Sequence, residues 1–391
     1  MPAPTDRSYD LVLFGATGFT GGLTADYLAR HLPPDARWAL AGRNRTKLEG
    51  VRDGLPTGAA AVPDLLIADS SDPDSLHRVA EATGVVITTV GPYLELGGPL
   101  VAACAAAGTD YVDLTGEPEF VDRMYVELHA AAAASGARLV HTCGFDSIPH
   151  DLGALYTVQQ LPDDAAIAVK GIVRSNGTFS GGTLHSALGQ MSRARQMRQA
   201  AAARAQVESR PEGRRVRAVA SRGLREAALG VWLLPLPTID PQVVKRSAMA
   251  SARYGPDFTY SHYAGLKRAA TAVAAIGGIA TFLAAVQIPP LRRLIGARLP
   301  QGEGPSEERR AKTWFTVDFI GEAGGQRVHT RVSGGDGGYT ETSKMIAEAA
   351  MSLAFDNNPP TSGQVTPAVA MGDNLIRRLV AAGIDFSIIG D

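Results

Sequence analysis

Three glycines near the start of the chain have a type and spacing that could hold a phosphate. Gly15, Gly18 and Gly21 follow the apolar run Leu11–Phe14 and precede a helical pattern from about Gly22. Glycine allows a tight turn and a close approach of backbone N–H groups to an anion, which a helix N-terminus stabilises. The G-x-x-G-x-x-G spacing departs from the commoner G-x-G-x-x-G, but the strand before it and the helix after it are typical of a dinucleotide site. The predicted pyrophosphate site comprises Gly15, Thr17, Gly18, Phe19, Thr20 and Gly21, and the alternative is a glycine-rich turn without a ligand.

An arginine follows the second predicted strand. Arg43 stands where a site specific for NAD would place a carboxylate on the ribose 2′-hydroxyl. A guanidinium can instead hold the 2′-phosphate of NADP through two charge-assisted hydrogen bonds. We therefore predict NADP(H) as the cofactor, with Asp69, after the third strand, in the same site. A solvated arginine would leave the choice of cofactor open.

Further candidates follow the fourth and sixth predicted strands. In a doubly wound sheet, ligands lie beyond the carboxyl ends of the strands, so these loops should face the reactive end of the cofactor. Gly91 would allow a close backbone approach, and Pro92 would stiffen the turn. The predicted cofactor contacts are Thr89, Val90, Gly91, Pro92 and Gly144, and the predicted catalytic candidates are Tyr93, Cys143 and Asp146. The alternative roles are packing for Tyr93, a small buried apolar side chain for Cys143 and a loop cap for Asp146.

These loops require a parallel sheet to position them. Short apolar runs alternate with alanine-rich helical stretches through about the first 150 of the 391 residues, a pattern typical of βαβ units. We predict an α/β protein with an N-terminal Rossmann-type doubly wound parallel sheet over residues 1–150. The strands are expected at Tyr9–Phe14, Arg37–Ala41, Asp64–Ala68, Val85–Thr89, Tyr111–Asp113 and Arg138–His141, and the helices near Gly22–His31, Ser75–Thr83, Pro99–Ala107 and Phe120–Ser135.

The alternation of short apolar runs with helical stretches ends near Asp151. A second, α+β substrate domain is predicted over residues 151–365. Its strands are expected at Ile167–Arg174, Thr313–Phe319 and Gln326–Ser333, with a glycine-rich turn joining the last two. A helix at Glu341–Phe355 would close this domain. Residues 366–391 are expected to form a helical segment that packs back on the first domain.

Charge and cysteine content exclude several classes of protein. The 38 lysines and arginines nearly balance the 39 aspartates and glutamates, which argues against a nucleic-acid binder. There are two cysteines and no apolar segment at the start, so we expect a cytoplasmic protein without a disulfide framework. No histidines, cysteines and carboxylates have the spacing of metal ligands, and no G-x-S-x-G follows a strand, so neither a metal site nor a serine hydrolase is predicted.

The chain resembles the saccharopine dehydrogenase-like oxidoreductases, and among them the trans-acting enoyl reductases that serve polyketide synthases in lipid assembly. The resemblance spans most of the chain and rests on five motifs, at residues 9–21, 40–43, 88–93, 108–117 and 143–149. It implies an NADPH-binding Rossmann domain with an inserted α+β domain. It also implies reduction of a carbon–carbon double bond in an acyl chain held as a thioester on a carrier protein or coenzyme A, with a polyketide synthase as partner.

Such a reduction needs an acid that protonates the α-carbon. Tyr93 is the first candidate because a tyrosine with a pKa near 10 stays protonated at neutral pH, whereas a solvated aspartate is ionised. His150 and His185 are further candidates because histidine titrates near neutrality. Two other functions remain open: a saccharopine-type reductase of a C=N bond, and a membrane-associated NADPH-binding adaptor without turnover.

Three other segments suggest contacts with a partner protein, with a membrane or with the substrate. Arginines greatly outnumber acids between Arg193 and Arg225, which suits an acidic carrier or the phosphates of coenzyme A, or is simply a solvated helix face. The uncharged stretch Ala269–Leu291 is long enough to cross a bilayer, but its glycines and prolines favour a buried helix or a peripheral contact with the inner face of the membrane. The turn Ser180–Thr183 is either an oxygen-binding site or a helix cap. Assembly into a homo-oligomer is left open.

Overall fold

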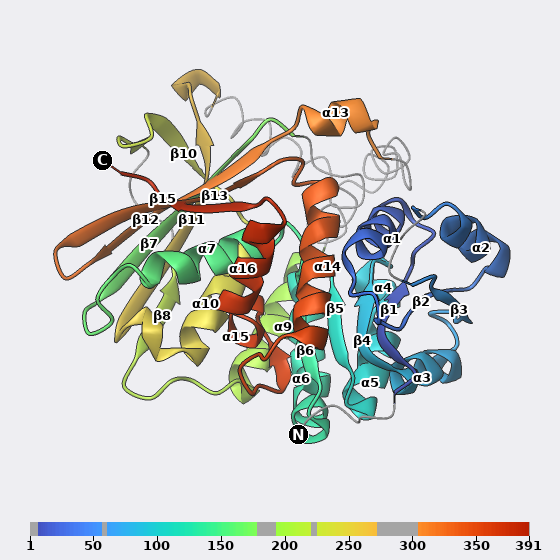
Figure 1. The fold of residues 1–391 in the computed structure, drawn as a ribbon. Coiled ribbons are helices and arrows are strands. Elements are labelled where there is room, and N and C mark those ends of the chain that lie inside the picture. Colours follow the sequence, from blue (N-terminus) through green and yellow to red (C-terminus); the bar gives the residue numbers. More distant parts are fainter. Residues whose placement is uncertain (1–6, 57–60, 178–192, 220–224, 272–303, 391) are drawn as a thin grey trace.

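The protein is built on two β-sheets with helices packed between and around them (Figure 1). A computed structural model describes residues 7–56, 61–177, 193–219, 225–271 and 304–390. The predicted positions Ser180–Thr183, His185 and residues 272–291 of the apolar stretch lie outside these ranges. No helix among the described residues is long and apolar enough to cross a membrane.

The first sheet has seven parallel strands in the order β14-β6-β5-β4-β1-β2-β3. Its central strands are apolar on both faces, as expected where helices cover both sides. The six strands predicted for this sheet are all present, each within two residues of its expected bounds. They are β1 (Tyr9–Phe14), β2 (Trp38–Gly42), β3 (Asp64–Ile67), β4 (Thr83–Thr88), β5 (Asp110–Asp113) and β6 (Arg138–Val140).

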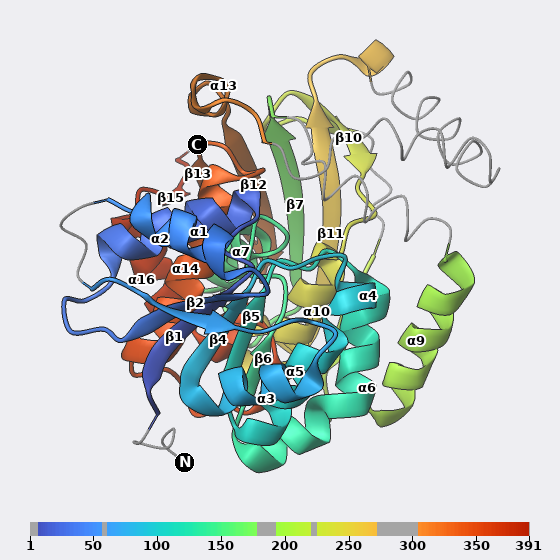
Figure 2. The same cartoon turned by 90° about the vertical axis from the view of Figure 1, so that its right-hand side faces the viewer.

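Helices cover the two faces of this sheet. On one face, α5 packs against both α3 and α6, whereas α1 and α14 pack together on the other. Figure 2 shows α9 (Ala194–Val207) alongside α6. The helices of this domain are α1 (Phe19–His31), α2 (Arg45–Asp53), α3 (Pro73–Ala82), α4 (Tyr93–Leu96), α5 (Gly98–Ala107), α6 (Pro118–Ser135) and α14 (Thr340–Phe355).

The second sheet is mixed. Its order is β15-β13-β12-β7-β11-β10-β9, and β8 pairs with β11. The predicted hairpin is confirmed, because β12 and β13 are joined by Gly324 and Gly325, both in the left-handed region. The strands are β7 (Ile167–Ser175), β8 (Arg215–Ala218), β9 (Arg225–Glu226), β10 (Val231–Pro235), β11 (Asp257–Leu266), β12 (Phe315–Ala323), β13 (Gln326–Gly334) and β15 (Asp385–Ile388).

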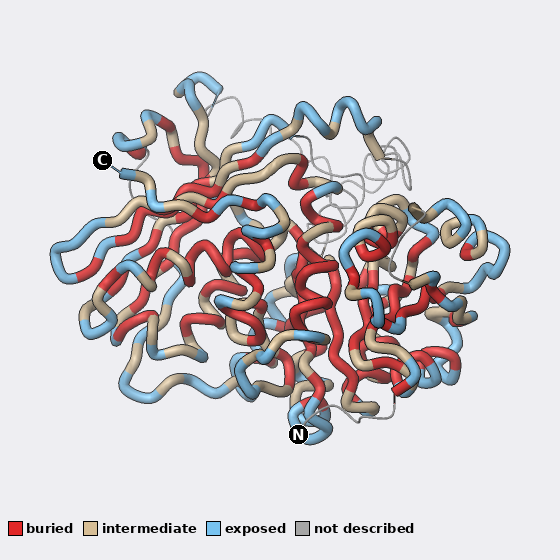
Figure 3. Tube along the Cα trace, in the orientation of Figure 1, coloured by how far each residue is buried: buried red, intermediate tan, exposed pale blue. Residues whose placement is uncertain are grey.

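The two sheets share an apolar core. One apolar core runs from Leu11 and Leu13 of β1, through Met345 of α14, to Phe315 and Phe319 of β12. Figure 3 shows α14 and α7 buried along most of their length between the two sheets. The helices outside the first domain are α7 (Ile148–Val158), α10 (Asp240–Ala250), the 3-10 turn η1 (Ala252–Tyr254), α13 (Glu307–Ala311), α15 (Pro367–Ala370) and α16 (Asp373–Ala381).

The C-terminal part of the chain does not follow the predicted division, in which the second domain ends at residue 365 and a separate helical segment begins at residue 366. The chain returns to the first sheet earlier, because α14 packs on β1, β4 and β5 and the short strand β14 (Gly363–Val365) pairs with β6. After α16, the strand β15 pairs with β13 of the second sheet. The last strand therefore joins the second sheet, whereas the helices before it contact the first domain, α16 through α14 and α15 through β6.

Candidate active site

The glycine loop closes on itself so tightly that side chains are excluded. Gly15 has a φ of +96°, and its N–H donates to the carbonyl of Ala41 at 3.0 Å. A Cβ atom on Gly15 would lie 2.6 Å from Cγ2 of Val90, and one on Gly21 would lie 2.1 Å from the carbonyl oxygen of Gly15. Glycine is therefore required at both positions for the chain to fold in this way.

The loop leaves backbone donors at the start of α1. Gly18 is the N-cap residue, with an extended backbone and no side chain to cap the helix. The first amides of a helix have no acceptor within it, so those of Phe19, Thr20 and Gly21 are available to an anion. The helix begins at Phe19, three residues before the predicted start, and this earlier start puts these amides at the carboxyl edge of the sheet. The arrangement suits a pyrophosphate.

Arg43 and Asp69 lie at the same edge of the sheet. Arg43 follows β2 and has an exposed side chain, and Asp69 follows β3. Hydrogen bonds from the backbone and hydroxyl of Ser71, together with the charge of Arg43, lower the pKa of Asp69. The two predicted residues are thus neighbours beside the glycine loop, where the adenosine half of a dinucleotide would lie.

The loop after β4 touches the glycine loop directly. The hydroxyl of Thr89 donates to the carbonyl of Gly15 at 3.2 Å, and Val90 lies against the same glycine. Gly91 and Pro92 continue this loop into α4. The structure therefore brings the predicted contacts after β1 and β4 together.

Tyr93, in contrast, lies inside the protein. Its side chain is 6% exposed, and its hydroxyl donates to the carbonyl of Thr88 and accepts from the N–H of Leu114, both at 3.1 Å. Burial, with the nearby charge of Asp113, raises its pKa well above the usual value. A hydroxyl held in this way cannot reach a substrate, so the geometry contradicts the predicted role of Tyr93 as proton donor. Its role is to tie the loop after β4 to the loop after β5.

Replacing Tyr93 with phenylalanine should therefore affect stability more than catalysis. The change leaves a buried carbonyl and a buried N–H without their partner, which costs about 1–3 kcal/mol. We expect urea denaturation to show that loss, while kcat stays within about threefold of wild type. A fall in kcat of two orders of magnitude with intact cofactor binding would instead restore the proton-donor role.

Buried carboxylates organise the loops beneath the site. Asp113 at the end of β5 accepts hydrogen bonds from the backbone N–H groups of Thr115 and Thr142 and from the hydroxyl of Tyr111. Its Oδ2 also lies 2.7 Å from Nδ1 of His141. The carboxylate of Glu117 accepts from the first two amides of α4. These buried residues hold the shape of the loops.

The loop after β6 carries the remaining candidates. Cys143 is fully buried and its thiol donates to the carbonyl of Val140, while burial raises its pKa well above the usual value. It is therefore not a reactive thiol, and the geometry contradicts its predicted catalytic role. Gly144 is packed so closely that a Cβ atom would lie 2.8 Å from Leu114, and the N–H of Phe145 donates to the hydroxyl of Thr342 in α14. Thr342 was missed from the sequence because it lies almost 200 residues away.

Asp146 is the candidate that the structure places well. Its side chain is partly buried beside Gly116, at the carboxyl edge of the parallel sheet. Burial, with the charge of Asp240, raises the pKa of Asp146 to about 8. The carboxyl group therefore carries a proton at neutral pH, contrary to the expectation for a solvated aspartate, and it can serve as a general acid.

Comparisons with known proteins agree with this geometry. A family model described as the saccharopine dehydrogenase NADP binding domain matches residues 11–140, which run from β1 to β6. Among solved structures, apo saccharopine dehydrogenase (L-Glu forming) from Saccharomyces cerevisiae aligns with a TM-score of 0.54 over 98% of this chain and 100% of that chain. The identity in that alignment is 11%, so it confirms the predicted fold and nothing further.

Relatives of higher identity cover the whole chain. A Mycobacterium tuberculosis protein that is provisionally named a trans-acting enoyl reductase is 41% identical over 410 residues, which cover 97% of each chain. A Mycobacterium bovis protein named trans-acting enoyl reductase is 34% identical over 417 residues, which cover 98% of each chain. The similarity therefore includes both sheets.

Proposed function

The chain belongs to the saccharopine dehydrogenase-like family of trans-acting enoyl reductases, and from that premise we propose that it reduces the carbon–carbon double bond of an acyl thioester with NADPH. The observation that carries this proposal is the glycine loop. Its free helix amides lie beside Arg43, in a chain that is similar to enoyl reductases over nearly its full length.

The residues around the loop fit the cofactor. The amides of Phe19, Thr20 and Gly21 would hold the pyrophosphate, and the guanidinium of Arg43 would hold the 2′-phosphate. The loops after β4 and β6 would enclose the nicotinamide end, because ligands of doubly wound sheets lie at this edge. When bound, NADPH supplies the hydride that is added to the β-carbon of the substrate.

Asp146 would supply the proton. Its protonated carboxyl group lies at the sheet edge that the nicotinamide end would share, and protonation of the α-carbon completes the reduction. One hydride and one proton are consumed for each double bond. Asp146 then recovers its proton from solvent, since its side chain is only partly buried.

A panel of substrates tests the proposal. Purified protein should consume NADPH with enoyl thioesters and remain inactive with imines formed from amino acids, which a C=N reductase would accept. Consumption with imines alone would favour that second activity. Binding of NADPH without turnover on any substrate would favour the adaptor.

We further propose an acidic acyl carrier protein of a polyketide or lipid synthase as the partner. Arg195 and Arg198 are exposed on one side of α9, whereas Arg204 of the same helix is buried and paired with Glu208. The guanidinium of Arg214 also has partners within the protein, because it donates hydrogen bonds to the carbonyls of Ala248 and Gly255. The basic segment therefore offers part of its charge to a partner.

Charge reversal of Arg195 and Arg198 to glutamate tests this surface. We expect turnover of a carrier-bound enoyl chain to fall about tenfold at low salt, because like charges slow the encounter. Turnover of a short pantetheine thioester should be unchanged and serves as the control. Equal effects on both substrates would remove this helix as the docking surface.

A further inference from the structure

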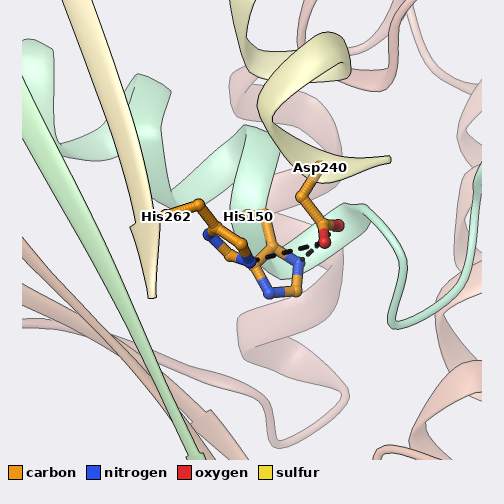
Figure 4. A group of neighbouring side chains, drawn as sticks. All are labelled: His150, Asp240 and His262. Carbon is orange, nitrogen blue, oxygen red and sulfur yellow. Dashed lines mark ion pairs between the residues drawn. The ribbon is translucent and has the colours of Figure 1, made fainter. Parts of the chain in front are cut away.

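Two histidines and an aspartate from three separate elements meet inside the protein. His150 lies in α7, Asp240 begins α10, and His262 lies in β11, and Figure 4 shows their side chains directed toward one another. Nδ1 of His150 is 3.1 Å from Oδ1 of Asp240, and Nε2 of His262 is 3.5 Å from Oδ2 of Asp240. All three side chains are about 1% exposed.

Hydrogen bonding does not account for this cluster. Within the described part of the chain, Nδ1 of His150, Oδ1 of Asp240 and Nε2 of His262 are buried atoms without a hydrogen-bond partner. A well-formed pair looks different in this protein, since Nε2 of His329 is hydrogen-bonded to Oδ1 of Asp318 at 2.8 Å. Buried polar atoms are nearly always paired, so three unpaired atoms in one cluster of side chains indicate a missing common partner.

The spacing of the three atoms suits a tetrahedral cation. Zinc lies about 2.0–2.1 Å from nitrogen and oxygen ligands, which places adjacent ligand atoms of a tetrahedron about 3.3 Å apart. Nδ1 of His150 and Oδ1 of Asp240 are 3.1 Å apart, close to this value, and each of the three residues has a ligand atom within 4.8 Å of the other two. Two imidazoles and one carboxylate would leave a fourth position open, as in zinc sites with three protein ligands.

The carboxylate of Asp240 is buried without an arginine or lysine partner among the described residues. A buried carboxylate normally has a cationic partner, as Asp318 has in Arg174 and Arg331. Asp240 instead faces the two imidazoles and the hydroxyl of Thr238, which donates to its Oδ2. A bound cation would supply the missing positive charge.

Tyr260 supplies the outer contact that metal-binding histidines usually have. Its hydroxyl lies 3.1 Å from Nδ1 of His262, the ring nitrogen that faces away from Asp240. A partner on this nitrogen fixes the ring and keeps Nε2 unprotonated for a metal.

We propose that His150, Asp240 and His262 bind a divalent cation of the zinc class. The site would fasten α7, which follows the loop of Asp146, to α10 and to the second sheet. The sequence predicted no metal because the three positions are far apart and no motif joins them. Because Asp240 lies close enough to Asp146 for their charges to interact, the tests of this site do not use enzyme activity.

Metal binding to the untagged full chain tests the site. After treatment with a chelator and dialysis, titration calorimetry with zinc should show about one ion per chain with a micromolar or lower Kd. Asp240→Asn should weaken binding by at least about 100-fold, and Tyr260→Phe by about 10–100-fold with unchanged stoichiometry. His329→Gln, which alters the other histidine–aspartate pair, should bind zinc like the wild type.

Cobalt provides a second measurement that needs no variant. The wild-type chain should take up one equivalent of cobalt with the visible absorption of a tetrahedral nitrogen and oxygen site, and zinc should displace it. Failure of the wild type to bind either ion, or equal zinc affinity in Asp240→Asn, would overturn the proposal.

Discussion

Asp146→Asn should lower kcat for reduction of an enoyl thioester by about 10²–10⁴-fold, the range expected when a positioned general acid is removed. Asparagine keeps the shape of the side chain but has no proton to give at neutral pH. The Kd for NADPH should stay within about threefold, because Asp146 follows β6 and the predicted phosphate contacts follow β1 and β2. Steady-state kinetics and cofactor titration together measure the two effects.

An exposed aspartate provides the control for this variant. Asp74 lies in the first turn of α3, and Asp74→Asn should leave both kcat and cofactor binding unchanged. An Asp146→Asn protein that turns over at the wild-type rate would mean that water or another group protonates the α-carbon. The raised pKa of Asp146 would then be a consequence of burial without a catalytic purpose.

Arg43→Ala should raise the Kd for NADPH by about 10–100-fold, because charge-assisted hydrogen bonds contribute about 1.5–3 kcal/mol. The Kd for NADH should change by less than about threefold, since NADH has no 2′-phosphate for the guanidinium to bind. The preference for NADPH would therefore be lost mainly through weaker binding of NADPH. Calorimetric titration of each cofactor measures this directly.

Arg37 is the matched control for Arg43. It immediately precedes β2, at the opposite end of the strand, where it pairs with Asp10 at 3.0 Å on the surface. Arg37→Ala should bind both cofactors like the wild type. Equal weakening of NADPH and NADH in Arg43→Ala would show that the arginine supports the fold of the loop and does not recognise the phosphate.

The first sheet could be predicted because the sequence features that specify it are local. The strands β1 and β4 contain the apolar runs 11–14 and 85–87, and Gly15 and Gly21 stand where no side chain fits. Each of these features is visible in a short window of sequence. The alternation of these strands with helices indicated a doubly wound sheet.

The return of the chain to this sheet could not be predicted in the same way. The helix α14 is buried on nearly all sides, so its apolar pattern does not tell which sheet it covers. The strand β14 has three residues, too few for a periodic signal. Its pairing with β6 depends on contacts between residues more than 200 positions apart.

The chemistry that a predicted site residue can perform depends on its burial, which the sequence does not show. Tyr93 and Asp146 both follow strands of the first sheet at its carboxyl edge, as expected from the sequence. The structure reverses their expected chemistry, because the hydroxyl of Tyr93 is used by the backbone and burial keeps Asp146 protonated. The cluster of His150, Asp240 and His262 has no signal in the sequence at all, since its members come from three distant elements.

Transfer of deuterium tests the reductase proposal most directly. An enoyl chain on a carrier protein or on pantetheine is incubated with the enzyme and NADPH labelled at C4 of the nicotinamide, with each of the two stereoisomers in turn. We expect a saturated thioester that carries one deuterium at the β-carbon with one of the two labels. An unreduced thioester with both labels, at protein concentrations that bind NADPH fully, would contradict it.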